Sequence, residues 1–211
     1  KLDFADAPRS GQDVLDIADV RAGYGQRVVL DQVNLHLRYG ERAALIGPNG
    51  SGKTTLLRCI TGQLAPWAGE VRLGRGVRLG YMAQEQETLD PQATPLALIR
   101  GAAALNETEA RSFLHYFLFT GDEVFLPVAQ LSFGERSRLA LALLAVTGCN
   151  CLLLDEPINH LDIPSRERFE QAMARFEGTA LAVVHDRYFI ERFATTLWMI
   201  QESRVQVMSA G

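Results

Sequence analysis

The sequence of 211 residues contains only three cysteines, and this odd number argues against a framework of disulfide bonds. It also lacks any run of about 18 apolar residues, so it predicts no membrane-spanning helix. No secretory signal pattern is visible. With a formal net charge of −4, the chain lacks the basic footprint of an autonomous nucleic-acid-binding domain. We therefore expect buried, reduced thiols and a cytoplasmic location.

What is present is a globular composition, with 47% hydrophobic and 22% charged residues, in a chain of one-domain length. Residues 1–12 are polar, and we expect them to be an incoming linker. We predict one domain over residues 13–211, with a small helical subdomain at about 90–147.

The most informative segment is Gly47–Thr54, which matches the pattern G-x-x-x-x-G-K-[ST]. Backbone N–H groups of such a loop surround phosphate oxygens, and the positive end of the following helix favours the same anion. The lysine would reach the β- and γ-phosphates, and the threonine hydroxyl would bind Mg²⁺. A predicted strand at Arg42–Ile46 and a predicted helix at Thr54–Ile60 favour this interpretation over an ordinary glycine-rich turn. The candidate nucleotide-binding residues here are Gly47, Pro48, Asn49, Gly50, Ser51, Gly52, Lys53, Thr54 and Thr55.

Strands alternating with helices predict an α/β fold. Continuous apolar runs at Leu152–Leu154 and Leu181–Val184 are typical of buried parallel strands. Antiparallel strands are expected at Val14–Ile17 and Val28–Leu37. Hairpins are expected from Gly69–Leu73 with Val77–Tyr81, and from Leu197–Ile200 with Val205–Val207.

Polar residues follow both apolar runs. Asp155 and Glu156 come after the first, in the crevice where ligands bind to such sheets. Asp155 would hold Mg²⁺ directly or through water, and Glu156 would polarise the attacking water. Alone, this pair would be a strand-end turn before Pro157; the phosphate loop upstream favours the metal site. After the second run, His185 either hydrogen-bonds the γ-phosphate or is a capping or core histidine.

Three weaker signals accompany these. At Leu131–Glu135, Ser132 and Glu135 form the pattern of a capping box at a helix start. The same helix N-terminus would suit a phosphate, and because one γ-phosphate site is already provided, it suggests a nucleotide held by another chain or domain. Tyr24 is a candidate for stacking on a purine, and Gln84 for contacting metal and water.

In this order, the motifs resemble the nucleotide-binding domain of ATP-binding cassette (ABC) proteins. Tyr24, the phosphate loop and Gln84 match its aromatic loop, Walker A and Q-loop. The residues Leu131, Ser132, Phe133, Gly134 and Glu135 match its signature, Asp155-Glu156 its Walker B motif, and His185 its switch histidine. The resemblance implies a P-loop ATPase fold with a mixed or parallel core sheet, an antiparallel β subdomain and a small inserted helical subdomain.

The stretches 154–162 and 185–189 resemble the D-E-P-T-N-H-L-D and H-D-R-Y-F sequences of the ABC-F group, whose members lack membrane domains. The short stretch between Gln84 and Leu131 leads us to expect the C-terminal cassette of a two-cassette protein. Phe133 replaces the usual first glycine of the signature, which puts turnover efficiency in doubt, and Ile158 replaces the usual threonine.

The resemblance implies a Mg²⁺-dependent ATPase whose metal ligands are Thr54, Gln84 and Asp155 and whose catalytic residues are Glu156 and His185. A second cassette, in the same polypeptide or in a homodimer, would enclose two ATP molecules with it. The ribosome is the expected partner of the full-length protein, in translation or in protection against antibiotics. The alternatives are the energy-coupling subunit of a membrane transporter and a regulatory module that binds nucleotide without turnover.

Overall fold

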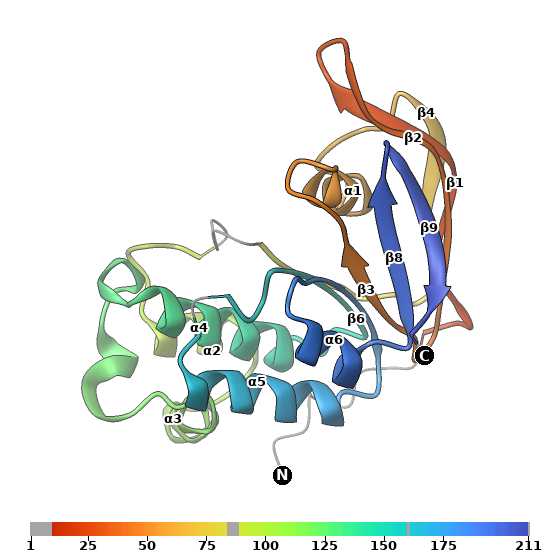
Figure 1. The fold of residues 1–211 in the computed structure, drawn as a ribbon. Coiled ribbons are helices and arrows are strands. Elements are labelled where there is room, and N and C mark those ends of the chain that lie inside the picture. The colour runs from red at the N-terminus through yellow and green to blue at the C-terminus, as the bar shows by residue number, and fades with distance from the viewer. Residues whose placement is uncertain (1–9, 84–88, 160, 211) are drawn as a thin grey trace. The chain divides into compact units, whose positions relative to one another are not determined.

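The computed structural model describes residues 10–83, 89–159 and 161–210 (Figure 1). The chain divides into two compact units. The first, called here the sheet unit, consists of Pro8–Tyr81, Asn150–Glu156 and Glu177–Gly211. The second, the helical unit, contains Met82–Cys149 and Pro157–Phe176. Among the described helices, none is both long and apolar enough to cross a bilayer.

Two sheets build the sheet unit. The first has the order β2-β1-β4 and is antiparallel. The second has six strands in the order β5-β6-β7-β3-β8-β9, and β6, β7, β3 and β8 run parallel. The bounds are β1 Asp13–Tyr24, β2 Arg27–Arg38, β3 Arg42–Ile46, β4 Ala68–Leu73, β5 Leu79–Met82, β6 Cys151–Asp155, β7 Thr179–Val183, β8 Thr196–Gln201 and β9 Arg204–Ser209, with helices α1 Lys53–Ile60 and α6 Arg187–Phe193.

The register of the parallel strands positions the candidate site. Leu45 of β3 pairs with Val183 of β7, and Val183 pairs on its other side with Asp155 of β6. The carboxyl ends of β3, β7 and β6 therefore lie side by side at one edge of the sheet. Because the carboxyl ends of parallel strands share one edge of a sheet, the segments that follow them meet there.

Burial explains why these strands form where they do. All five residues of β6 and all five of β7 are buried, as expected for parallel strands covered on both faces. The core of the sheet unit combines side chains from both sheets and from α1, and it includes Trp198, which has no exposed surface. Cys59, Cys149 and Cys151 are buried free thiols, as predicted.

The helical unit contains α2 Pro95–Ala102, α3 Glu107–Tyr116, α4 Phe133–Val146 and α5 Ile163–Arg175, with short 3₁₀ turns at Gly121–Phe125 and Val128–Gln130. Side chains cap all four α-helices: Thr94, Asn106, Ser132 and Asp162 each accept a backbone N–H from the first turn. Local sequence therefore fixes where these helices begin.

The predicted hairpin between Gly69–Leu73 and Val77–Tyr81 is wrong. β4 pairs with β1 in the antiparallel sheet, whereas β5 lies beside β6 in the other sheet. The predicted C-terminal hairpin is confirmed, because β8 and β9 pair from Thr196–Ser209 to Gln201–Arg204. The predicted strand at Arg42–Ile46 is also confirmed. Residues 1–9 of the predicted linker lie outside the described residues.

Candidate functional site

The loop from β3 to α1 needs glycine at positions where the backbone enters the left-handed region. Gly47, Gly50 and Gly52 have φ angles of 153°, 75° and 112°. A Cβ on Gly47 would lie 2.7 Å from the carbonyl oxygen of Ile200. Gly52 is the N-cap of α1 and supplies no side-chain cap, so the first N–H groups of the helix face the loop rather than a capping side chain. Such a turn into a helix N-terminus suits a phosphate group.

Lys53 lies against this loop with only 7% of its surface exposed. Its Nζ donates to the carbonyl oxygens of Gly47, at 2.8 Å, and Pro48, at 2.9 Å. Burial lowers the pKa of the ammonium, while the charges of Glu156 and Asp155 act in the opposite direction. The two hydrogen bonds hold the ammonium group at the loop, where phosphate oxygens would bind.

Thr54 and Asp155 join the loop to the end of β6. The Thr54 hydroxyl donates to Oδ2 of Asp155 at 3.2 Å. The other carboxylate oxygen, Oδ1, is buried and has no hydrogen-bond partner among the described residues, and the same holds for Oγ of Ser51 in the loop. Burial raises the pKa of Asp155, although the hydrogen bond from Thr54 lowers it. A buried oxygen without a partner needs a ligand or a compensating interaction.

A hydroxyl and a carboxylate beside a phosphate loop form the oxygen donor set that Mg²⁺ uses together with nucleotide phosphates. Thr54 and Asp155 therefore fit this ion. The third predicted ligand, Gln84, lies outside the described residues.

Glu156 directly follows the end of β6, and His185 lies two residues after the end of β7. Oε1 of Glu156 lies 3.4 Å from Nε2 of His185, and their side chains are 16% and 43% exposed. The backbone N–H of Glu156 donates to the carbonyl oxygen of Val183 at 3.1 Å, which ties the turn to β7. Glu156 has a φ of 53°, in the left-handed region that only glycine adopts without strain. The sheet thus brings together five of the candidate residues: Lys53, Thr54, Asp155, Glu156 and His185.

Tyr24 ends β1 and is 45% exposed. Its Oη accepts a hydrogen bond from Nη1 of Arg58 at 3.2 Å, so α1 holds the ring in place from the helix that starts at the loop. Sequence reasoning missed Arg58 and also Trp67, a 46% exposed tryptophan just before β4. Trp67, between Pro66 and Ala68-Gly69, had a detectable signal, since a large aromatic residue in a turn has no core position to explain it.

The signature residues belong to the helical unit. Ser132 caps α4: its Oγ accepts from the N–H of Glu135 at 3.3 Å, and the Glu135 carboxylate accepts from the N–H of Ser132 at 2.7 Å. The predicted capping box is confirmed. Phe133 is the first helical residue and Gly134 the second, so the ring replaces a glycine in the first turn. Hydrogen bonds from Ser132 hold the pKa of Glu135 below its usual value.

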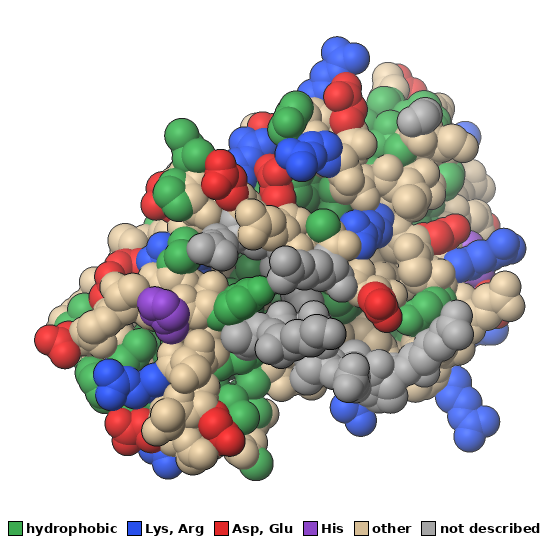
Figure 2. Space-filling view, turned by 90° about the horizontal axis from the view of Figure 1, so that it is seen from below, with side chains coloured by type: hydrophobic (Ala, Val, Ile, Leu, Met, Phe, Trp, Pro, Cys, Tyr) green, Lys and Arg blue, Asp and Glu red, His purple; other side chains and the backbone are tan. Residues whose placement is uncertain are grey.

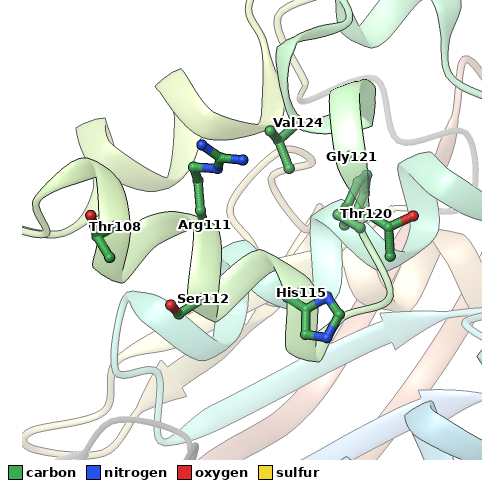
Figure 3. Close-up of a pocket in the computed structure, with 8 residues that line it drawn as sticks. Thr108, Arg111, Ser112, His115, Thr120, Gly121 and Val124 are labelled. Atoms are coloured by element: carbon green, nitrogen blue, oxygen red, sulfur yellow. The ribbon is translucent and has the colours of Figure 1, made fainter.

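The helical unit also carries an open pocket of about 510 Å³ that the sequence did not predict (Figure 3). Thr108, Arg111, Ser112 and His115 line it from one stripe of α3, opposite Thr120, Gly121 and Val124. The Arg111 guanidinium lies 5.5 Å from the ring centroid of Phe125. None of the predicted site residues lines this pocket.

Comparison with known proteins places this geometry in a family. Residues 30–159, more than half of the chain, match the ABC transporter family. The chain is 40% identical over 195 residues to the "Probable ATP-binding protein YheS" of Escherichia coli (strain K12), covering 92% of this chain and 31% of that protein. It is 38% identical over 200 residues to the "Energy-dependent translational throttle protein EttA" of the same organism, covering 92% of this chain and 36% of that protein.

The chain thus spans about a third of the length of these relatives. Among solved structures, the fold matches the dimeric, post-hydrolysis state of the ATP-binding cassette MJ0796 bound to ADP and Pi, with a TM-score of 0.80. That match has 21% identity and covers 93% of this chain and 99% of that one. The recognition from sequence motifs and the predicted fold class are both confirmed. The chain belongs to the ABC transporter family and is one of its ATPase domains.

Proposed function

We propose that this chain is an ATP-hydrolysing cassette of an ABC-F protein that closes on a second cassette around two ATP molecules. The observation that carries the proposal is the contact between Thr54 and Asp155, with the buried Oδ1 of Asp155 lacking a partner among the described residues. Lys53, bound to the loop, and Glu156, the residue after Asp155, complete a site for a phosphate and a hard cation.

The binding residues have separate tasks in this proposal. Tyr24 stacks on the adenine, and residues 47–55 hold the phosphates. Thr54, Gln84 and Asp155 hold Mg²⁺, which would neutralise the charge on the transferred phosphate.

Two further residues serve the reaction itself. Glu156 orients the attacking water and takes its proton, since its carboxylate lies at the end of the row of strands. His185, 3.4 Å from Glu156, donates a hydrogen bond to the γ-phosphate.

The signature residues would act on the nucleotide of the partner cassette. The N-terminus of α4, with the hydroxyl of Ser132 and the backbone of Gly134, suits an anionic group. ATP would favour the closed pair and hydrolysis would reopen it, which is a ligand-driven shift of populations. Phe133 would slow turnover by restricting the approach of the backbone to the phosphate.

We further propose that the protein works in the cytoplasm and acts on the ribosome; its relative EttA is named an energy-dependent translational throttle protein. The residues Leu161-Asp162 and His185–Phe189 support the ABC-F assignment made from sequence. Figure 2 shows Lys and Arg side chains interspersed with Asp and Glu on the face in view, without a basic area. Because the whole chain has a formal net charge of −4, other parts of the full-length protein would supply the positive charge that ribosomal RNA attracts.

The first test concerns the chemistry. Glu156→Gln should retain ATP binding and lower the hydrolysis rate by about 10²- to 10⁴-fold, the usual contribution of a general base. Phosphate release reports the rate, and equilibrium titration reports binding. The matched control is Glu191→Gln, which removes an exposed carboxylate paired with Arg187 on α6 and should change neither quantity. Hydrolysis at the wild-type rate in Glu156→Gln would show that the base is another group.

The second test concerns the partner. Glu156→Gln in the full-length protein should sediment with purified ribosomes in ATP and not in ADP. Equal absence of binding in both nucleotides would overturn the ribosomal role. Fractionation with membranes would instead support the energy-coupling subunit of a transporter.

A further inference from the structure

Trp67 lies beside the end of β1, where Tyr24 is located. Its backbone N–H donates to the carbonyl oxygen of Arg21 at 2.7 Å, and the next residue, Ala68, pairs with Arg21 across the two strands. In Figure 1 the start of β4 accordingly lies next to the end of the β1–β2 hairpin. Residues from two distant parts of the sequence thus meet at this corner of the sheet unit.

The indole packs against the residue that precedes Tyr24. A Cβ on Gly23 would lie only 2.8 Å from Cη2 of Trp67 and 2.0 Å from the carbonyl oxygen of Arg27. Glycine at this position therefore lets the tryptophan ring reach the backbone of β1. The contact places one edge of the indole against Gly23, the residue that precedes Tyr24.

Trp67 nevertheless keeps a large exposed surface. Trp67 is 46% exposed and Tyr24 is 45% exposed, whereas the other tryptophan, Trp198, is fully buried. Two large aromatic side chains at one corner therefore present apolar surface that the core does not use. The π-faces of aromatic rings stack on nucleobases, and tryptophan offers the largest such face.

The position also suits a base whose phosphates are at the loop. Arg58 binds the hydroxyl of Tyr24 and belongs to α1, the helix whose N-terminus follows the phosphate loop. Through Arg58, α1 therefore holds the Tyr24 ring at its far end, and the glycine loop lies at its start. A nucleotide matches this arrangement, because it is an elongated ligand with an aromatic base at one end and anionic groups at the other.

We propose that Trp67 is a second aromatic contact for the nucleobase, so that the base site contains Tyr24 and Trp67 rather than Tyr24 alone. The inference rests on the proposed function, because it assigns a residue to the same nucleotide site. It implies selection for purines over pyrimidines, since two stacking partners favour the larger ring system.

The two tryptophans of the chain make a direct test possible, because only Trp67 is exposed. Titration of the 211-residue chain with ATP should change its tryptophan emission in a saturable way, and tripolyphosphate should not. Trp67→Phe, which leaves Trp198 as the only tryptophan, should lose the ATP-dependent change in tryptophan emission. This variant keeps an aromatic ring and tests the inference even where Trp67→Ala fails to fold.

Binding measured by calorimetry supplies the second readout. Trp67→Ala should weaken ATP binding by about 5- to 150-fold, the range expected for one lost stacking contact, and leave tripolyphosphate binding unchanged. CTP should bind the wild-type chain more weakly than ATP, and Trp67→Ala should reduce this difference. The control is Tyr188→Ala, which removes a 61% exposed aromatic residue on α6 and should leave ATP affinity unchanged.

The outcomes separate this inference from the proposed function. Saturable ATP binding with unchanged emission from Trp67 would overturn the inference alone. Equal loss of ATP and tripolyphosphate binding in Trp67→Ala would also overturn the inference. Such a result would show that Trp67 only stabilises the structure of β1. If the wild-type chain bound neither ATP nor tripolyphosphate, the proposed function would fail and the inference with it.

Discussion

Replacing Asp155 by asparagine should stabilise the protein in the absence of metal. The carboxylate is 2% exposed, and its Oδ1 has no hydrogen-bond partner among the described residues. An asparagine keeps the shape and removes the charge. The Thr54 hydroxyl, which donates to Oδ2, can instead accept from the new amide N–H. Lys53 keeps both of its carbonyl partners.

The size of the effect follows from the buried oxygen. An unsatisfied buried acceptor costs about 1–3 kcal/mol, and more when it is charged. The amide oxygen would remain without a partner, so only part of this cost is removed, about 1–2 kcal/mol. For a chain of about 200 residues, each kcal/mol shifts Tm by roughly 2–4 °C. Asp155→Asn should therefore raise Tm by about 2–8 °C.

Scanning calorimetry in a chelator at neutral pH, without nucleotide, measures this shift. A ligand that binds only the folded state stabilises it, so Mg²⁺ and ATP should raise the Tm of the wild-type chain more than that of Asp155→Asn. The variant should also lose ATP hydrolysis. Greater stability with less activity is the expected sign of a carboxylate kept for metal binding.

The matched control is the same substitution at a carboxylate that the fold stabilises. Asp162 caps α5 by accepting the N–H of Ser165 at 3.3 Å, and its hydrogen bond with Ser165 holds its pKa below the usual value. Asp162→Asn keeps a good capping residue but removes the favourable charge at the helix N-terminus, so it should lower stability by about 0.3–1 kcal/mol. An unchanged or lower Tm for Asp155→Asn in chelator would refute the reasoning.

Three further predictions follow from single positions. Gly47→Ala should abolish tight nucleotide binding and lower Tm, because the φ of 153° and the carbonyl of Ile200 leave no space for a Cβ; titration with a fluorescent nucleotide measures the binding. Hydrogen bonds with Ser132 lower the pKa of Glu135, so its stabilisation is present above the unfolded pKa of about 4.5 and is lost as the pH falls through the folded pKa. Glu135→Gln should therefore reduce the loss of unfolding free energy at acidic pH, which urea unfolding at a series of pH values measures. Leu57→Ala, at a fully buried position, should cost about 2–5 kcal/mol in urea unfolding.

Sequence reasoning succeeded where local pattern and local structure coincide. The apolar runs at 152–154 and 181–184 lie in β6 and at β7, whose residues are buried throughout. The strand at Arg42–Ile46 leads directly into the glycine loop and α1, as the motif requires. The capping box at Ser132 formed because it depends on four consecutive residues and nothing more distant.

Sequence reasoning failed where contacts with residues distant in the sequence determine the structure. Gly74 stays attached to β1, since its N–H donates to the carbonyl of Val14 at 2.9 Å and a Cβ would meet the carbonyl of Asp13. Arg78 is instead held by the side chain of Asn150, at 2.7 Å, at the start of β6. The turn between them therefore crosses from one sheet to the other, although its composition is typical of a hairpin. The contact between Trp67 and Gly23 was hidden for the same reason.

Glu156 shows how a side chain can be predicted where its backbone cannot. The residue before a proline normally adopts extended or polyproline-like angles, yet Glu156, before Pro157, has a φ of 53°. A non-glycine residue in the left-handed region costs of order 1–3 kcal/mol. Glycine would adopt this conformation without that cost, so the fold alone gives no reason for glutamate. The turn places the carboxylate 3.4 Å from His185, directly after Asp155 at the end of β6. The role proposed for Glu156 in ATP hydrolysis would therefore explain why glutamate occupies this position.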